Sequence, residues 1–211
     1  MALFENATVF VIDDDQQARE SVCALVQSMG LRSRDFVSAE EFLDHIDRDV
    51  RGCVVSDLRM LGMNGLELQD TMRARGVIIP VILITAYPRT SLTVRAMKQG
   101  AVTLLEKPYE EDDLWDAVRE ALRISELQYD KQARRRDILQ RLELLTPKEH
   151  QVMELMVEGI ANKVIANRLD VSIRTVENRR HDIFEKMNAS SLAELVRMVV
   201  SIRDDESDSD L

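Results

Sequence analysis

Long hydrophobic runs and a basic N-terminal region are both missing from this 211-residue sequence. No apolar stretch approaches the ~20 residues that a membrane-spanning helix needs, so we expect no membrane association. The first residues lack the basic region of a signal peptide, and three aspartates follow early. These absences predict a cytoplasmic protein.

Cysteine is scarce, with Cys23 and Cys53 as the only two. Neither belongs to a CxxC pair, and the three histidines make no zinc-site spacing with them. Both cysteines lie in apolar runs, so we interpret them as small core residues.

Basic residues are outnumbered by acidic ones, 28 to 38, which gives a formal net charge of −10. The acidity is uneven, however: residues 1–124 carry 14 basic and 21 acidic side chains, whereas residues 125–203 carry 14 and 12. Nucleic-acid binding needs local positive charge, so the second half remains a candidate. Residues 204–211 contain five acids and no base, which predicts a disordered tail that either aids solubility or weakens non-specific DNA binding.

The first half alternates between short aliphatic or β-branched runs and helical patterns. The runs suit strands buried on both faces. Strict alternation of strand and helix predicts an α/β fold with right-handed crossovers and a five-stranded parallel sheet in the flavodoxin-like doubly wound order. The predicted strands are residues 8–12, 32–36, 53–56, 81–85 and 102–105.

The second half is predicted to be entirely helical. No glycine or proline occurs between Tyr109 and Thr146, so we expect residues 124–144 to form a helical linker. Thr146 to Glu149 then combine a capping box with proline at the first helical position. Ser172 is a predicted cap of a later helix, and residues 145–203 are expected to form an all-α four-helix domain.

Polar groups follow four of the predicted strands. Asp13 and Asp14 follow the first, Asp57 ends the third, Thr85 ends the fourth and Lys107 follows the fifth. Carboxyl ends of strands meet at one edge of such a sheet. Crowded carboxylates favour a divalent cation, and few ligands with open water positions suit magnesium. A carboxylate can attack a phosphoryl group while a lysine and a hydroxyl hold its oxygens.

Residues 1–123 resemble the receiver domain of two-component response regulators, through Val11 to Asp15, Asp57 to Met60, Thr85-Ala86 and Glu106 to Pro108. The resemblance implies that Asp57 is the phosphoacceptor and that Thr85 and Lys107 contact the phosphoryl group. It also implies Mg²⁺ (or Mn²⁺) held by Asp14, Asp57 and the backbone carbonyl of Arg59, with Asp13 acting through water. A cis Lys107–Pro108 bond and a sensor histidine kinase partner are further implications.

Three positions depart from the receiver pattern and bear on its switch. Leu61 stands where proline is usual, which predicts a more mobile loop over residues 61–65. Leu104 replaces the usual phenylalanine or tyrosine, so we expect only a partial shift on activation, with some dimer present beforehand. Tyr87, two residues after Thr85, is less usual and is expected to alter the rate of dephosphorylation.

Residues 145–203 resemble the LuxR-type helix-turn-helix domain, and the two halves together resemble the FixJ branch of response regulators. The carrying stretches are residues 145–149, 162–169, 172–176 and 183–187. The resemblance implies that polar residues on the third helix meet base edges in the major groove while basic residues meet phosphates. The implied base contacts are Glu177, Asn178 and His181, and the implied contacts to DNA phosphates are Lys163, Arg174, Thr175, Arg180 and Lys186. Arg179 departs from the pattern, because it stands where the family usually has histidine, and we expect it to add a phosphate contact.

The sequence therefore predicts a phosphorylation-switched transcription regulator rather than an enzyme, apart from self-dephosphorylation. Its expected partners are double-stranded DNA, RNA polymerase and a second copy of the chain on phosphorylation. A magnesium-dependent phosphohydrolase is an alternative, but it needs a general acid two residues after the nucleophile, where Arg59 stands. A constitutive DNA-binding regulator with a poorly switching receiver is the other alternative.

Overall fold

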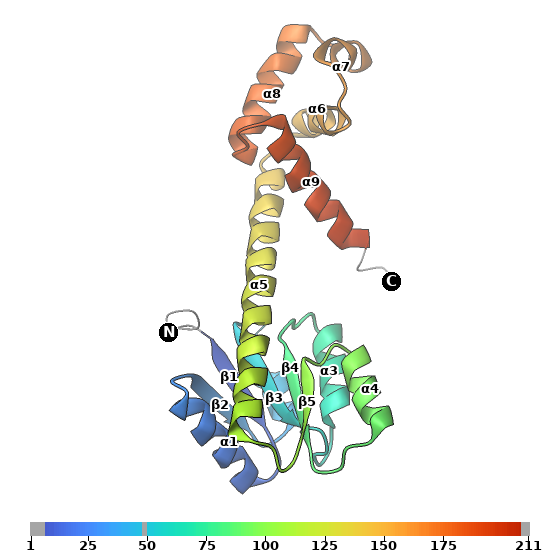
Figure 1. Cartoon of the computed structure of the whole chain (residues 1–211). Helices are drawn as coiled ribbons and strands as arrows, with labels where there is room; N and C mark the ends of the chain where they lie inside the picture. The colour runs from blue at the N-terminus through green and yellow to red at the C-terminus, as the bar shows by residue number, and fades with distance from the viewer. Residues whose placement is uncertain (1–6, 48–49, 208–211) are drawn as a thin grey trace. The chain divides into compact units, whose positions relative to one another are not determined.

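The computed structural model describes residues 7–47 and 50–207, with side chains described as far as Arg203. Contacts between residues divide the chain into two compact units, Met1–Asp130 and Lys131–Leu211 (Figure 1). Across the described residues, no helix combines the length and apolar character needed to cross a bilayer.

The first unit is built on a five-stranded parallel sheet with the order β2-β1-β3-β4-β5. The predicted α/β class and doubly wound order are therefore confirmed. Three strands coincide with their predicted ranges, while β3 is longer and β5 is shifted by one residue. The strands are β1 (Thr8–Ile12), β2 (Arg32–Phe36), β3 (Gly52–Asp57), β4 (Val81–Thr85) and β5 (Thr103–Glu106).

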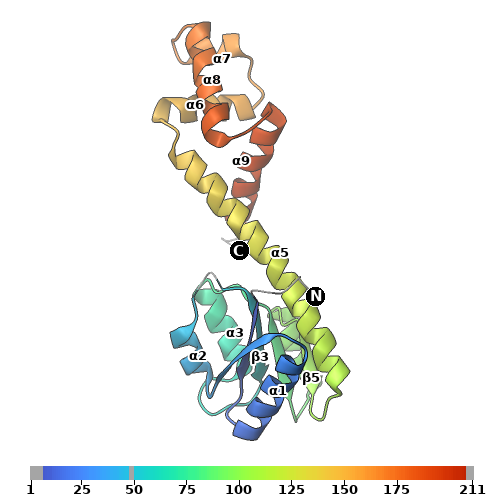
Figure 2. The ribbon, with the colours of Figure 1, turned by 90° about the vertical axis from the view of Figure 1, so that its left-hand side faces the viewer.

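Helices cover both faces of this sheet (Figures 1 and 2). On one face, Phe10 and Leu83 pack with Phe42 of α2, Leu68 of α3 and Ala96 of α4. The opposite face packs against α1 and α5 through a second apolar cluster. The sheet is thus buried on both faces, which explains its nearly continuous apolar strands. These helices are α1 (Gln16–Ser28), α2 (Ala39–His45), α3 (Gly65–Ala74), α4 (Thr90–Lys98) and α5 (Glu111–Glu143).

Capping side chains set where α1, α2 and α3 begin. The Asp15 carboxylate accepts a hydrogen bond from the Ala18 backbone N–H at 2.8 Å and starts α1. The Ser38 hydroxyl accepts one from the Glu41 N–H at 3.2 Å and starts α2. Asn64 forms a reciprocal capping box with Glu67 at the start of α3. These side chains satisfy backbone donors that have no partner within the helix.

The second unit consists of helices around one apolar core. Thr146 and Glu149 form the predicted capping box of α6, with Pro147 in its first turn. Val176, Ile183 and Met187 of α8 are fully buried in this core. The helices are α6 (Pro147–Val157), α7 (Asn162–Arg168), α8 (Ile173–Met187) and α9 (Leu192–Ser207).

The expected linker at residues 124–144 is not a separate helix. It continues α5, which runs without interruption for 33 residues. Ser125 and Tyr129 belong to the first unit, where the Ser125 hydroxyl accepts from the Gly52 N–H at 3.1 Å and Arg51 lies over the Tyr129 ring. Ile138 is already buried in the core of the second unit.

The first residues of the acidic tail, which was expected to be disordered, are helical. Residues 204–207 belong to α9, because no glycine or proline interrupts the helix before Ser207. Residues 208–211 lie outside the described residues.

Candidate functional site

Three of the predicted acidic-site residues converge at the carboxyl ends of the strands. The Lys107 ammonium lies 2.7 Å from Asp57 Oδ1 and 3.0 Å from Asp13 Oδ2. Asp57 ends β3, Asp13 follows β1, and Lys107 follows β5. Parallel strands bring together side chains that lie up to 94 positions apart in the sequence.

Backbone N–H groups bind one further oxygen of each carboxylate in this acidic cluster. Asp57 Oδ2 accepts a hydrogen bond from the Arg59 N–H at 2.7 Å, and Asp14 Oδ2 accepts one from the Leu61 N–H at 3.0 Å. Asp13 Oδ1 accepts from the Asp15 N–H at 2.9 Å. These bonds orient the three carboxylates before any ligand binds.

Close packing fixes the backbone that follows Asp57. Gly65, at the start of α3, donates its N–H to the Leu58 carbonyl at 3.1 Å. A Cβ atom at this glycine would lie only 2.9 Å from the Asp57 carbonyl oxygen. The absence of a side chain at residue 65 therefore lets α3 approach the strand end that carries Asp57.

Electrostatics keep Lys107 charged. Burial alone would lower the pKa of its ammonium, but hydrogen bonds and charge attraction from Asp57 and Asp13 outweigh burial and raise it. For the neighbouring Tyr109 hydroxyl, burial raises the pKa; the Lys107 charge opposes this rise, and the charges of Asp13 and Asp57 add to it. Two carboxylates and one ammonium thus share a largely buried site.

The donor set of this site suits a small, hard cation. Within residues 7–47 and 50–207, no three carboxylate, histidine or cysteine side chains lie close enough to form a metal site by themselves. A magnesium ion needs fewer protein ligands than three, because it typically takes one or two carboxylates and keeps several waters. Asp13 and Asp57 already converge on one positive charge, that of Lys107, so they fit this ion.

Thr85, Tyr87 and Arg59 lie at the border of the cluster. The Thr85 side chain is buried, and its hydroxyl accepts from the Tyr87 N–H at 3.2 Å. The Arg59 guanidinium lies 5.2 Å from the centre of the Tyr87 ring, a cation–π contact. This border of the acidic cluster is solvent-accessible, since Tyr87 is 65% exposed.

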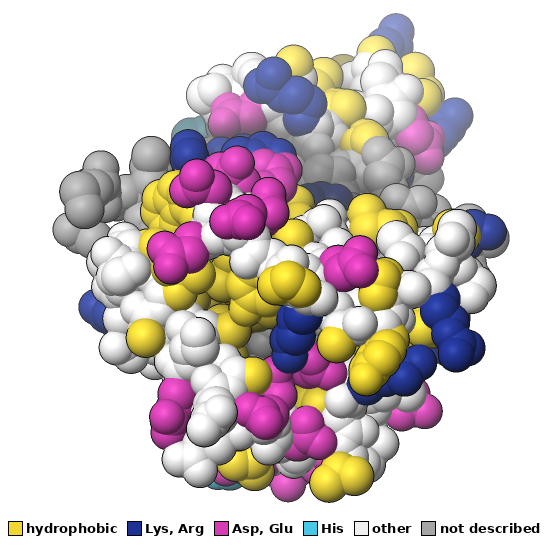
Figure 3. Space-filling view, turned by 60° about the horizontal axis from the view of Figure 1, so that its bottom comes forward, with side chains coloured by type: hydrophobic (Ala, Val, Ile, Leu, Met, Phe, Trp, Pro, Cys, Tyr) yellow, Lys and Arg dark blue, Asp and Glu magenta, His cyan; other side chains and the backbone are white. Residues whose placement is uncertain are grey.

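The same edge of the sheet exposes both acidic and apolar side chains. Leu61 is 82% exposed and Val37 is exposed as well. Figure 3 brings this side of the molecule forward and shows acidic side chains gathered with hydrophobic ones between them.

Leu104 of β5, the predicted switch residue, is half-buried and packs against the core that α2, α3 and α4 cover. The peptide bond between Lys107 and Pro108 is cis.

A second set of candidate residues lies on α8 and α7. Ser172 caps α8 by accepting from the Thr175 N–H at 3.0 Å, as predicted, whereas Ala161 provides no side-chain cap for α7. Polar residues of the first turns of α8 point to solvent. Among the predicted DNA contacts, the exposed residues are Lys163 of α7 and Arg174, Glu177, Asn178 and His181 of α8, and the half-buried residues are Thr175, Arg179 and Arg180 of α8.

Lys186 is placed differently from the other predicted DNA contacts. Its ammonium binds both carboxylate oxygens of Glu149, at 2.9 and 2.7 Å, and its side chain is 33% exposed. Burial alone would raise the pKa of Glu149, but its bonds to Lys186 and Thr146 lower it. Lys186 therefore makes an internal contact between α6 and α8.

Two contacts near Lys186 were not anticipated from the sequence. Arg141, near the end of α5, donates to the Met187 carbonyl at 2.9 Å. The His150 ring contacts the Leu142 carbonyl at 3.0 Å. Both side chains bind backbone carbonyls at helix ends, where these groups lack helical partners. No sequence pattern pairs residues this far apart on separate helices.

Comparison with protein families divides the chain in the same way. Residues 9–119 match the family described as response regulator receiver domain. Residues 143–199 match bacterial regulatory proteins of the luxR family.

Two transcription or response regulators are similar to this chain over most of its length. The chain is 42% identical over 192 residues to the transcriptional regulatory protein FixJ of Bradyrhizobium diazoefficiens, covering 91% of this chain and 94% of FixJ. It is 35% identical to the response regulator protein TodT of Pseudomonas putida, covering 94% and 87%.

Two solved structures of response regulators are also similar to this chain over most of its length. The response regulator StyR matches with a TM-score of 0.82 and 40% identity, over 92% of this chain and 98% of StyR. Full-length FixJ from B. japonicum matches with a TM-score of 0.55 and 40% identity, over 93% and 97%.

Proposed function

This chain belongs to the FixJ-like two-component response regulators, which control transcription, and on that premise we propose that phosphorylation of Asp57 controls its DNA binding. The observation that carries the proposal is the convergence of Asp13, Asp57 and Lys107 at one end of the sheet. A receiver domain implies a sensor kinase as the phosphoryl donor.

In the proposed reaction, a carboxylate oxygen of Asp57 attacks the phosphorus atom of a phosphohistidine on the kinase. A phosphorus–oxygen bond forms, and the bond to the histidine nitrogen breaks. Lys107 then holds a phosphoryl oxygen with its ammonium, and the Thr85 hydroxyl donates to another. The raised pKa of Lys107 supports this role, because the ammonium stays protonated during the reaction.

Asp14, Asp57 and the Arg59 carbonyl are proposed to hold Mg²⁺ or Mn²⁺, with Asp13 supporting the ion through water. The ion would supply positive charge to the phosphoryl oxygens. The Arg59 N–H and Leu61 N–H support this arrangement by orienting Asp57 and Asp14. Self-dephosphorylation is part of the proposal, with Tyr87 limiting the access of water.

The DNA-reading surface is proposed to be the exposed face of α8. Glu177, Asn178 and His181 would meet base edges, while Lys163 and Arg174 would meet phosphates. Thr175, Arg179 and Arg180 would add contacts to DNA phosphates. For Lys186 we propose a positioning role instead, since its ammonium is held by Glu149.

Homodimerisation on phosphorylation is proposed to couple the two activities. Thr85 and Lys107 are joined to the start of α4 and to β5 by the chain, so a bound phosphoryl group can bias that region between two arrangements. Two DNA-binding domains presented together gain effective concentration for paired half-sites. Recruitment of RNA polymerase would follow at the promoter.

The proposed domain boundaries are a receiver at residues 1–123, a helical connection at 124–144 and a DNA-binding domain at 145–203. A constitutive DNA-binding regulator is not favoured, because Asp57, Thr85 and Lys107 are all present at the strand ends.

The test is DNA binding as a function of phosphorylation. DNA sequences selected by the full chain would be titrated with protein, with and without the phosphoryl mimic beryllofluoride. We expect tighter binding with beryllofluoride for the wild type and no change for Asp57→Asn. Equal affinity under all four conditions would contradict control by Asp57.

A further inference from the structure

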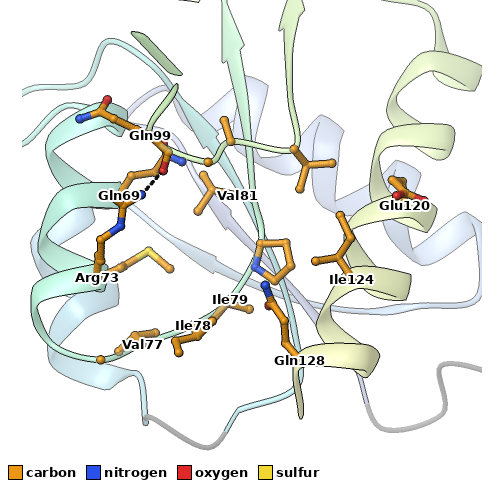
Figure 4. Close-up of a pocket in the computed structure, with 16 residues that line it drawn as sticks. Gln69, Arg73, Val77, Ile78, Ile79, Val81, Gln99, Glu120, Ile124 and Gln128 are labelled. Carbon is orange, nitrogen blue, oxygen red and sulfur yellow. Dashed lines mark hydrogen bonds between the residues drawn. The ribbon is translucent and has the colours of Figure 1, made fainter. Parts of the chain in front are cut away.

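The two ends of the sheet differ in the groups that they offer to a ligand. Where β4 begins, a pocket of about 560 Å³ is lined by Gln69 and Gln128, among others (Figure 4). The side-chain amide oxygens of both glutamines are buried, and two charged residues of the lining, Arg73 and Glu120, are bound to other groups of the chain. An ionic ligand is better placed at the opposite end of the sheet, where the acidic cluster surrounds Asp57.

The loop between Asp57 and α3 is held by two carboxylates from other parts of the fold. The Leu61 N–H donates to Asp14 Oδ2 at 3.0 Å, and the Met63 N–H donates to Glu40 Oε1 at 2.8 Å. Asp14 lies between β1 and α1, whereas Glu40 lies in the first turn of α2. The absence of proline at residue 61, which predicted a more mobile loop, also makes the first of these bonds possible, because proline has no N–H.

Gly62, between the two donors, allows the close approach of Glu40. Its φ of +81° lies in the left-handed region that favours glycine, and a Cβ atom there would lie only 2.8 Å from Glu40 Oε1. The Glu40 carboxylate also accepts from its own backbone N–H, and this bond, together with the one from Met63, lowers the pKa of its carboxyl group. Glu40 therefore binds the loop as a charged acceptor at neutral pH.

Residue 61 contributes to the acidic site through its backbone rather than its side chain. Leu61 is 82% exposed, whereas its N–H is bound to Asp14. Asp14 is itself an exposed residue, so this bond restricts a carboxylate that could otherwise adopt several rotamers. A carboxylate has more acceptor positions than one N–H occupies. The bond therefore restrains Asp14 and still leaves positions for an ion.

We propose that Leu61 and Glu40 are positioning residues of the Mg²⁺ site. The Leu61 N–H holds Asp14 in an orientation that binds the ion, and Glu40 holds the loop that carries this N–H. The inference rests on the proposed function, because it takes Asp14 as a ligand of the ion. Groups that orient metal ligands through hydrogen bonds increase metal affinity without touching the metal.

The first test is Mg²⁺ binding to the full chain without a phosphoryl donor, followed by nuclear magnetic resonance of the backbone amide signals. Leu61→Pro removes the N–H, whereas Leu61→Ala removes most of the side chain and keeps the N–H. We expect Leu61→Pro to weaken Mg²⁺ binding by about tenfold, as is usual when a group that orients a metal ligand is lost. Leu61→Ala should bind like the wild type. Equal affinity in Leu61→Pro and the wild type would overturn the role of the N–H.

The second test compares two variants of Glu40 that lose the same charge. Only Glu40→Gln keeps a side-chain oxygen that can accept from the Met63 N–H, so we expect Glu40→Ala to bind Mg²⁺ more weakly than Glu40→Gln. The same affinity in both variants would mean that Glu40 acts through its charge alone, and its positioning role would be wrong. This pair also tests the loop if Leu61→Pro does not fold.

Asp14→Asn separates a failure of this inference from a failure of the proposed metal site. If Asp14→Asn bound Mg²⁺ as tightly as the wild type, or if the wild type bound none, the metal site would be wrong and the inference with it. Loss of binding in Asp14→Asn together with wild-type affinity in Leu61→Pro would overturn only the positioning role.

Discussion

Lys186 lies within 2.9 Å of both carboxylate oxygens of Glu149, and this pair joins the start of α6 to the last turn of α8. Glu149 also accepts hydrogen bonds from the backbone N–H and the hydroxyl of Thr146, at 2.6 and 2.9 Å. One buried carboxylate therefore caps α6 and anchors α8. The position of the proposed recognition helix α8 is therefore fixed in part by a carboxylate of α6.

Removal of this anchor should destabilise the second unit. Glu149→Gln keeps the shape of the side chain but loses the charge that binds Lys186, so we expect a loss of about 1.5–3 kcal/mol, the usual range for hydrogen bonds to charged groups. Urea unfolding followed by circular dichroism measures this change. Glu158→Gln, at an exposed position after α6, is the control and should leave the stability nearly unchanged.

The ion pair between Glu149 and Lys186 also predicts how the loss of stability in Glu149→Gln depends on pH. The pKa of Glu149 in the folded chain lies below its ordinary value of 4.5, so its stabilising effect is present above that value and disappears as the pH falls through the folded-state pKa. The stability difference between the wild type and Glu149→Gln should therefore shrink on acidification below pH 4.5. A difference that stays constant down to pH 2 would contradict the ion pair.

Base reading and phosphate binding should separate on the exposed face of α8 and α7. Asn178→Ala should lose about 1–3 kcal/mol of discrimination at one base pair if its contact is bidentate. Lys163→Ala should weaken binding to all sequences alike and reduce the salt dependence by about one phosphate contact. Binding assays over a salt series with selected and scrambled DNA measure both effects. Wild-type behaviour in both variants would place the reading surface elsewhere.

The acidic site could be predicted from the sequence because its geometry follows from topology. Once β1, β3 and β5 are recognised as parallel strands, Asp13, Asp57 and Lys107 must meet at their carboxyl ends. The capping box at Thr146 was predictable for a similar reason, since it needs only residues three positions apart.

Contacts between separate helices could not be predicted in this way. Lys186 is an ordinary solvent-facing lysine in sequence, and only the packing angle of α6 against α8 brings it to Glu149. The pocket lined by Gln69 and Gln128 likewise depends on how α3 and α5 pack at the edge of the sheet. Glutamines in helices carry no sequence signal for a cavity.

The contact between Arg59 and Tyr87 should affect how long Asp57 stays phosphorylated. Arg59 lies two residues after Asp57, and Tyr87 lies two residues after Thr85, so both border the site. We expect this pair to hinder the attack of water on the phosphorylated Asp57. We expect Tyr87→Ala to shorten the phosphoryl lifetime severalfold, measured by loss of label after removal of the donor. Arg59→Ala should act in the same direction, and the double variant should show less than the product of the two effects if they act as a pair.

Dimerisation should respond to phosphorylation only in part. Leu104 is half-buried against the core and cannot reproduce the reorientation of an aromatic ring, so we expect some dimer before activation and more afterwards. Sedimentation velocity with and without beryllofluoride measures the two populations. If the mass distribution and the DNA affinity both stayed unchanged, the receiver would control the second unit by another route.

Phosphorylation of Asp57 tests the central claim most directly. The full chain would be incubated with acetyl phosphate and Mg²⁺, and its intact mass would be measured. The account predicts the addition of one phosphoryl group that is lost when the metal is chelated beforehand and in Asp57→Asn, while Asp44→Asn, at an exposed carboxylate of α2, still accepts it. Labelling that persists in Asp57→Asn, or that is indifferent to the metal, would contradict the account.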